Sequence, residues 1–157
     1  MALDPTARRA NVQDSMKKYF VDNFETTEGI ALRFDRTIAA PTLQGHEVDK
    51  WLSIIFGAMD RKSLSDFNVQ IFCATRKDTE GFRVAQLVDT VYGYIKDSTQ
   101  TDGMARIPLY RSRADAAWTL LDGGIVIQNI AESGVMDTDD LSKYIVLTLR
   151  CRWGTKI

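Results

Sequence analysis

Apolar side chains recur at steps of three and four positions in two segments of the chain, and this spacing predicts a helix in each. The first segment covers residues 6–24. It follows Asp4 and Pro5, where an aspartate can cap free amides and a proline is tolerated in the first turn. The apolar stripe of this predicted helix consists of Val12, Met16, Tyr19, Phe20 and Phe24.

The second predicted helix covers residues 82–95 and has a broader apolar face. Asp78 or Thr79 precedes it, and either side chain can cap its first turn. Polar residues occupy the remaining positions, which is typical of an amphipathic helix packed on a core. We expect the apolar face to contain Phe82, Ala85, Val88, Val91, Tyr92 and Ile95.

Elsewhere the apolar positions alternate with polar ones, which is the period of a half-buried β-strand. Alternation or short apolar runs predict strands at residues 30–35, 48–58, 67–74, 105–110, 118–121, 124–130 and 144–153. A loop over residues 36–47 joins the first two strands, and we expect these strands to pair as a hairpin. Pro108 lacks an amide donor and favours a sheet edge. A bulge or tight turn is expected at residues 122–124.

These elements together predict an α+β fold. An antiparallel or mixed β-sheet is packed with two α-helices, in the order α-β-β-β-α-β-β-β. With 157 residues and no linker-like stretch, the chain is interpreted as a single domain over residues 1–157. The hydrophobic fraction of 45% is sufficient for the core of such a domain.

Charge and cysteine content narrow the classes of function. Twenty basic and 21 acidic side chains give a net charge of −1, which argues against strong, salt-dependent binding to nucleic acid. Cys73 and Cys151 lie in apolar or alternating segments, so we expect buried thiols in a reducing cytoplasm. The N-terminus has no apolar signal core, and the longest apolar run, residues 54–59, is too short to cross a membrane.

The reactive side chains do not form a recognisable catalytic or metal-binding set. His46 is the only histidine, and a single histidine in a loop is more often a surface residue than a base. Asp137, Asp139 and Asp140 resemble the start of a calcium loop, but Leu141 follows them where a carboxylate is required. We therefore expect no enzymatic activity, no catalytic, cofactor-binding or metal-binding residues, and no cofactor.

Basic residues on and near the C-terminal strands offer an alternative function, which is direct contact with DNA through a stripe of arginines. They line up as a stripe only if their strands are neighbours; otherwise they belong to ordinary solvated faces. If aligned, the stripe contains Arg106, Arg111, Arg113, Arg150 and Arg152.

The arrangement as a whole resembles the tail terminator family of long-tailed bacteriophages, the lambda-type tail-completion proteins. The resemblance covers nearly the whole chain. It rests on the capped N-terminal helix, the long tip at residues 36–47, and the strand-then-helix segment FNVQIFCATRKDTEGFRVAQLVDTVYGYI at residues 67–95. The closing strand KYIVLTLRCRW at residues 143–153 completes it.

This resemblance implies a structural virion protein at the head-proximal end of the tail, assembled in the host cytoplasm. Six copies form a ring that caps the tail tube, stops its polymerisation and offers a joining surface to the head. The expected partners are further copies of itself, the tail tube protein and the head-tail connector, with DNA passing through the ring lumen and no membrane. A neck connector, a tube subunit and a small-molecule-binding α+β domain remain as alternatives.

Polar loops between strands that carry a few apolar residues, here called tips, are the expected contact sites between the subunits of such a ring and its partners. The candidate interface residues are Leu43 and His46 in the first tip, with Val135, Met136, Asp139 and Asp140 in the second. The alternative is that these are ordinary loop residues, since exposed apolar side chains are common.

Overall fold

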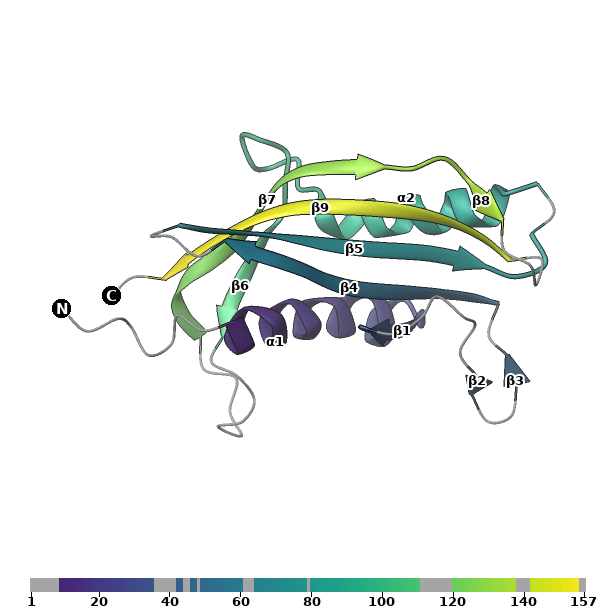
Figure 1. Ribbon diagram of the computed structural model, residues 1–157, viewed down its shortest axis with the longest axis horizontal. Helices are drawn as coiled ribbons and strands as arrows, with labels where there is room; N and C mark the ends of the chain where they lie inside the picture. Colours follow the sequence, from purple (N-terminus) through teal and green to yellow (C-terminus); the bar gives the residue numbers. More distant parts are fainter. Residues whose placement is uncertain are drawn as a thin grey trace.

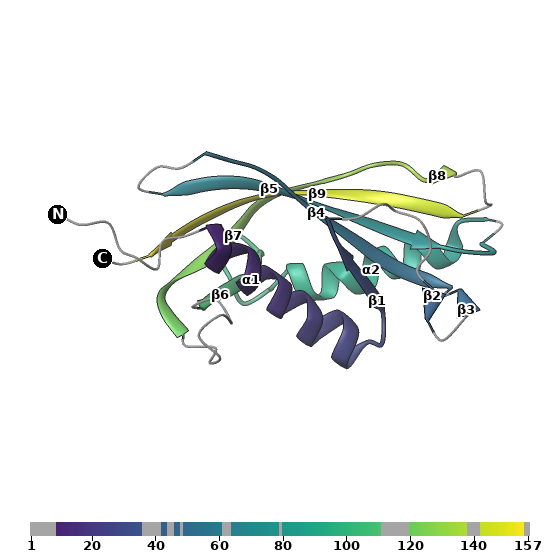
Figure 2. The same cartoon turned by 60° about the horizontal axis from the view of Figure 1, so that its bottom comes forward.

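A long, twisted β-sheet carries both helices on one of its faces (Figures 1 and 2). The computed structural model describes residues 9–35, 42–43, 46–47, 49–60, 64–78, 80–110, 120–137 and 142–155. The strand order is β1-β4-β5-β9-β7-β6, with the short β8 also paired to β9. Parallel and antiparallel pairs occur together, which confirms the predicted α+β fold with a mixed sheet.

The N-terminal helix runs further than its apolar stripe predicts. An α-helix, α1 (Arg9–Phe20), continues as a π-helical segment, η1 (Val21–Thr27). The wider turn keeps Phe20 and Phe24 on the core side, where their rings stack at 5.5 Å. Gly29, with a φ of 68°, ends the segment because its left-handed conformation suits glycine. The predicted start at residue 6 lies outside the described residues.

The first two predicted strands do not form a hairpin. Strand β1 (Ala31–Phe34) runs parallel to β4 (Lys50–Asp60), with Ala31 opposite Trp51 and Phe34 opposite Ile54. Parallel neighbours require a long crossover, and the long connection between these strands provides one. It contains a separate two-stranded sheet of β2 (Thr42–Leu43) and β3 (His46–Glu47). The hairpin prediction was wrong because alternation does not encode strand direction.

The centre of the sheet is antiparallel and connects to the second helix. Strand β5 (Ser65–Thr75) pairs with β4 on one side and with β9 (Lys143–Thr155) on the other. Helix α2 (Phe82–Ile95) follows β5, as its spacing predicts. In β9, alternate residues point into the core, from Ile145 to Trp153, and none is more than 5% exposed.

The remaining strands form the far side of the sheet. They are β6 (Arg106–Tyr110), β7 (Leu120–Glu132) and β8 (Met136–Asp137). Strand β6, which contains Pro108, is the last strand in the order and is therefore an edge strand, as predicted. Pro108 and Tyr110 are two residues apart in β6, but their partners in β7, Gly124 and Leu120, are four residues apart. The irregularity predicted around residues 122–124 is therefore a β-bulge.

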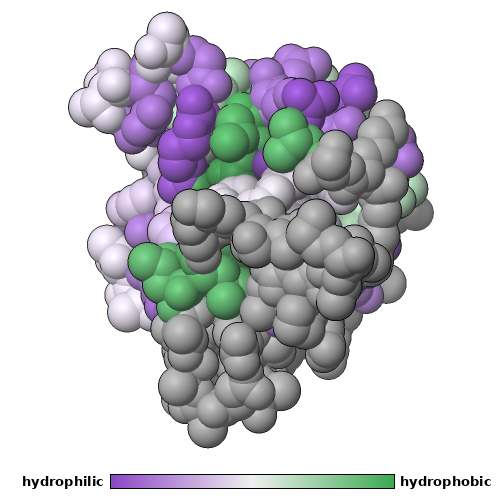
Figure 3. Space-filling view, turned by 90° about the vertical axis from the view of Figure 1, so that its left-hand side faces the viewer, coloured by the Kyte–Doolittle hydropathy of each residue, from purple (hydrophilic) through white to green (hydrophobic). Residues whose placement is uncertain are grey.

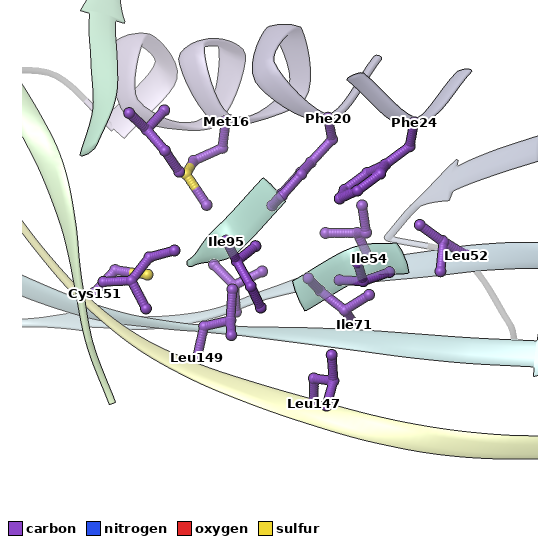
Figure 4. Close-up of a cluster of buried hydrophobic side chains, with 14 of the residues drawn as sticks. Met16, Phe20, Phe24, Leu52, Ile54, Ile71, Ile95, Leu147, Leu149 and Cys151 are labelled. Carbon is purple, nitrogen blue, oxygen red and sulfur yellow. The ribbon is translucent and has the colours of Figure 1, made fainter. Parts of the chain in front are cut away.

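The core lies between the inner face of the sheet and the two helices (Figure 4). Met16 and Phe20 of α1 and Ile95 of α2 meet strand residues such as Ile71 and Leu149, all fully buried. Each large apolar side chain buried in this way contributes about 1.5–3 kcal/mol. No helix among the described residues is long and apolar enough to cross a membrane.

Candidate functional site

Exposed apolar side chains gather where α2 begins. Phe82, the first residue of α2, is 66% exposed, and Val135, just before β8, is 51% exposed. The two segments touch, since a Cβ placed on Gly81 would lie 3.6 Å from Cγ1 of Val135. Met136 follows and is half-buried. We call Phe82, Val135 and Met136 the α2-end patch. Exposed apolar residues such as Phe82 and Val135 are typical of contact sites.

A buried carboxylate fixes the turn that presents Phe82. Asp78, only 6% exposed, accepts hydrogen bonds from the Val84 amide at 2.9 Å and the Thr75 hydroxyl at 3.1 Å. Burial alone would raise the pKa of Asp78, but hydrogen bonds from backbone amides and from Thr75 outweigh it and hold this pKa below its ordinary value. Gly81 completes the turn with a φ of 77°.

The opposite end of the molecule carries a second pair of exposed apolar residues. Leu64, just before β5, is 53% exposed, and Leu120, the first residue of β7, is 63% exposed. Figure 1 places the starts of β5 and β7 at one end of the long axis and the starts of α2 and β8 at the other. Figure 3 views the first of these ends, where hydrophobic surface emerges between hydrophilic residues. We call Leu64 and Leu120 the strand-start pair.

The predicted interface residues separate into two groups. Val135 and Met136 lie together in the α2-end patch, while Leu43 and His46 pair with each other in the β2–β3 sheet, where the structure describes the backbone only. Asp139 and Asp140 lie outside the described residues. Ala85 was predicted to lie on the apolar, core-facing side of α2 but is exposed, and the same prediction was wrong for Phe82. Its place at the first helical position, directly after a glycine, was the available signal.

Three of the predicted basic residues share the outer face of the sheet, the face away from the helices. Arg106 and Arg152 both lie opposite Val126 in the strand register, two strands or roughly 10 Å apart. Each is neutralised, because Arg106 contacts Asp102 at 3.1 Å and Arg152 contacts Asp66 at 2.9 Å. Arg111 and Arg113 lie outside the described residues, so the five-residue stripe stays a prediction.

A shallow hollow lies beside Arg150 on this outer face. A register shift in β4 between Phe56 and Met59 opens it, and its volume is about 480 Å³. Met59, Asp66, Asn68 and Arg150 are among its lining residues. Binding sites for small molecules are usually mostly apolar with a few convergent polar groups, whereas this hollow mixes both charges. It therefore gives little support to a small-molecule site.

The two thiols are fully buried in the core, as predicted. Burial raises the pKa of Cys151 to about 12 and also raises that of Cys73, where nearby Glu132 adds to the effect. Both thiols are therefore protonated at neutral pH and shielded from reagents. Within the described part of the chain, no three His, Cys, Asp or Glu residues are grouped so that they could hold a metal ion.

Comparison with known proteins identifies the fold but no family. No protein-family model matches the chain, and no curated protein sequence matches it. Eleven chains of solved structures do match. One of them, whose name describes no activity, has a TM-score of 0.58 and 9% identity over 92% of this chain and 97% of its own. At this identity the similarity concerns the fold alone.

Proposed function

We propose that this protein is a tail terminator: a structural subunit whose ring caps the tail tube of a long-tailed phage and joins it to the head. The observation that carries the proposal is the pair of apolar ends. The α2-end patch lies at one end of the long axis and the strand-start pair at the other. A subunit placed between a tube and a neck needs two such docking surfaces.

The chemistry of the described residues supports a structural role. Both cysteines are inert by burial, and Arg106 and Arg152 of the outer face are each paired with an aspartate. A protein that acts by docking needs shape and surface, and it needs no activated nucleophile or base. The same two ends also suit a neck connector or a tube subunit, so the test must separate these roles.

The test mixes the purified protein with the tube subunit of its own phage and images the products by electron microscopy. A terminator produces tubes that carry a cap at one end and stop growing. Growth that continues with the protein built into the tube wall identifies a tube subunit. Tubes that grow unchanged and carry no cap contradict the proposal.

Variants at the two ends sharpen the test. We expect Phe82→Ser or Leu120→Ser to reduce capping at least tenfold while leaving the fold intact, because both side chains are mainly exposed. Gln86→Ser, an exposed polar position on α2, is the matched control and should cap normally. Normal capping by both end variants would show that the apolar ends do not dock.

A further inference from the structure

Phe82 places a large aromatic ring in solvent at the very start of α2. Its side chain is 66% exposed, whereas Leu87, Val88 and Val91 of the same helix are at most 3% exposed. Aromatic side chains are among those that contribute most to protein–protein contacts. The backbone that carries this ring is held by several hydrogen bonds, which is unusual for an exposed corner of a molecule.

Asp78 supplies the cap that this helix otherwise lacks. The N-cap residue of α2 is Gly81, which has no side chain that could accept a hydrogen bond from the first free amides. The carboxylate of Asp78 takes that role, since it accepts the Val84 amide at 2.9 Å. It also accepts the Thr75 hydroxyl at 3.1 Å, so one buried group joins the end of β5 to the start of α2.

The residue before Asp78 is held in a strained conformation. Lys77 has a φ of 54°, in the left-handed region that a residue with a Cβ rarely adopts, and its side chain is exposed. On either side, the Arg76 amide donates to the Asp49 carbonyl at 2.8 Å, and the Arg83 guanidinium donates to the Arg76 carbonyl at 2.9 Å. Strained residues persist only where their surroundings fix them, and they cluster at binding sites.

The same turn sets the position of Phe82 relative to the other exposed residue of the α2-end patch. Gly81 is buried, and a Cβ added to it would lie 3.6 Å from Cγ1 of Val135 and 3.8 Å from Cδ of Lys143. Lys143 in turn contacts Asp137 of β8 at 2.5 Å. The start of α2 therefore rests on the corner between β8 and β9, at the end of the long axis where Figure 1 shows them together.

We infer that Asp78 is a positioning residue: it holds Phe82 as the anchor of a docking contact, and the partner protein receives the ring in an apolar pocket. The inference rests on the proposed function, which assigns the α2-end patch to docking. An anchor that is already fixed loses little conformational freedom on binding, and this raises affinity without any added contact. Loosening the turn therefore weakens docking, although Asp78 itself is only 6% exposed.

The restraint on position 82 is measured on the isolated protein with a nitroxide spin label. Phe82→Cys carries the label, and the natural thiols are buried and do not compete. Adding Asp78→Asn should make the label move about twofold faster, because the amide lacks the charge that strengthens both hydrogen bonds. A label at Gln86→Cys, exposed one turn further along α2, is the matched control and should not respond. Unchanged motion at position 82 overturns the inference.

A double-mutant cycle tests whether Asp78 acts on docking through Phe82. Docking is measured as the protein concentration that half-saturates the capping of tubes, and as the joining of capped tails to filled heads. In the step that Phe82→Ser weakens, Asp78→Asn should weaken docking by about two- to tenfold, which is the cost of immobilising one side chain. It should weaken docking no further when Phe82→Ser is already present.

A variant of comparable stability separates positioning from a general loss of stability. Ile71→Val removes one buried carbon in the middle of β5, far from the turn in sequence, and should dock at the natural level. The inference is overturned if Ile71→Val weakens docking as much as Asp78→Asn does, or if Asp78→Asn and Phe82→Ser act additively. It is also overturned if Phe82→Ser weakens neither step.

The two proposals fail in different ways. If Asp78→Asn frees the label at position 82 but the natural protein leaves tubes uncapped, the restraint on Phe82 stands and the terminator function is wrong. If tubes are capped and Asp78→Asn docks at the natural level, the function stands and the positioning role of Asp78 is wrong.

Discussion

Replacing Asp78 tests whether one buried carboxylate holds the turn between β5 and α2. Its carboxylate accepts the Val84 amide at 2.9 Å and the Thr75 hydroxyl at 3.1 Å. Hydrogen bonds to a charged group contribute about 1.5–3 kcal/mol each, so the lower value for both gives a loss of roughly 3 kcal/mol for Asp78→Ala. Asp78→Asn keeps an acceptor but loses the charge, and we expect roughly half that loss.

The dependence on pH identifies the charge as the cause. Hydrogen bonds hold the pKa of folded Asp78 below the ordinary 3.8, so the folded state binds this proton less tightly than the unfolded state. The stabilisation is complete well above pH 3.8 and is lost as the pH falls through the folded pKa. The gap in unfolding free energy between the natural protein and Asp78→Asn should therefore be constant near neutral pH and shrink in acid.

Urea denaturation followed by circular dichroism, repeated from pH 7 down to the lowest pH at which the protein folds, measures both effects. Asp89→Asn, at an exposed position of α2, is the matched control and should change stability by less than about 0.5 kcal/mol. A loss for Asp78→Ala no larger than this control, or a gap that does not shrink in acid, would refute the reasoning.

Two further predictions follow from buried polar groups. Ser15→Ala removes the hydrogen bond that the buried Ser15 hydroxyl accepts from the Tyr110 amide, and it should cost about 1–3 kcal/mol in urea denaturation. Thr90→Ala removes only an exposed hydrogen bond and should cost far less, and equal losses would show that Ser15 does not secure β6. Maleimide should label Cys73 and Cys151 at pH 8 only as fast as the protein unfolds, because burial keeps both thiols protonated and covered. Rapid labelling of the folded protein would contradict this.

Periodicity identified the elements that bury one continuous face. The alternation in β9 correctly assigned Ile145 through Trp153 to the core, and the helical spacing gave the bounds of α2. Both cysteines were assigned to the interior for the same reason. These predictions succeed because the side that each residue faces is a local property of the backbone repeat.

The candidate contact surface was predicted only in part. The composition of the second tip pointed to Val135 and Met136, which lie in the α2-end patch. Phe82 fits the apolar spacing of α2 and was therefore assigned to the core, yet it is 66% exposed. Spacing places a residue on a helix face, but whether the core extends as far as the helix end depends on how the helix sits against the sheet.

The sequence by itself thus determined both helices, most of the long strands and their core-facing residues, the α+β class and the buried thiols. The tertiary structure alone decided that β1 runs parallel to β4, and that Arg106 and Arg152 lie two strands apart, each paired with an aspartate. Each of these depends on which distant segments become neighbours. Strand alternation is the same for parallel, antiparallel, central and edge strands, so only long-range packing can distinguish them.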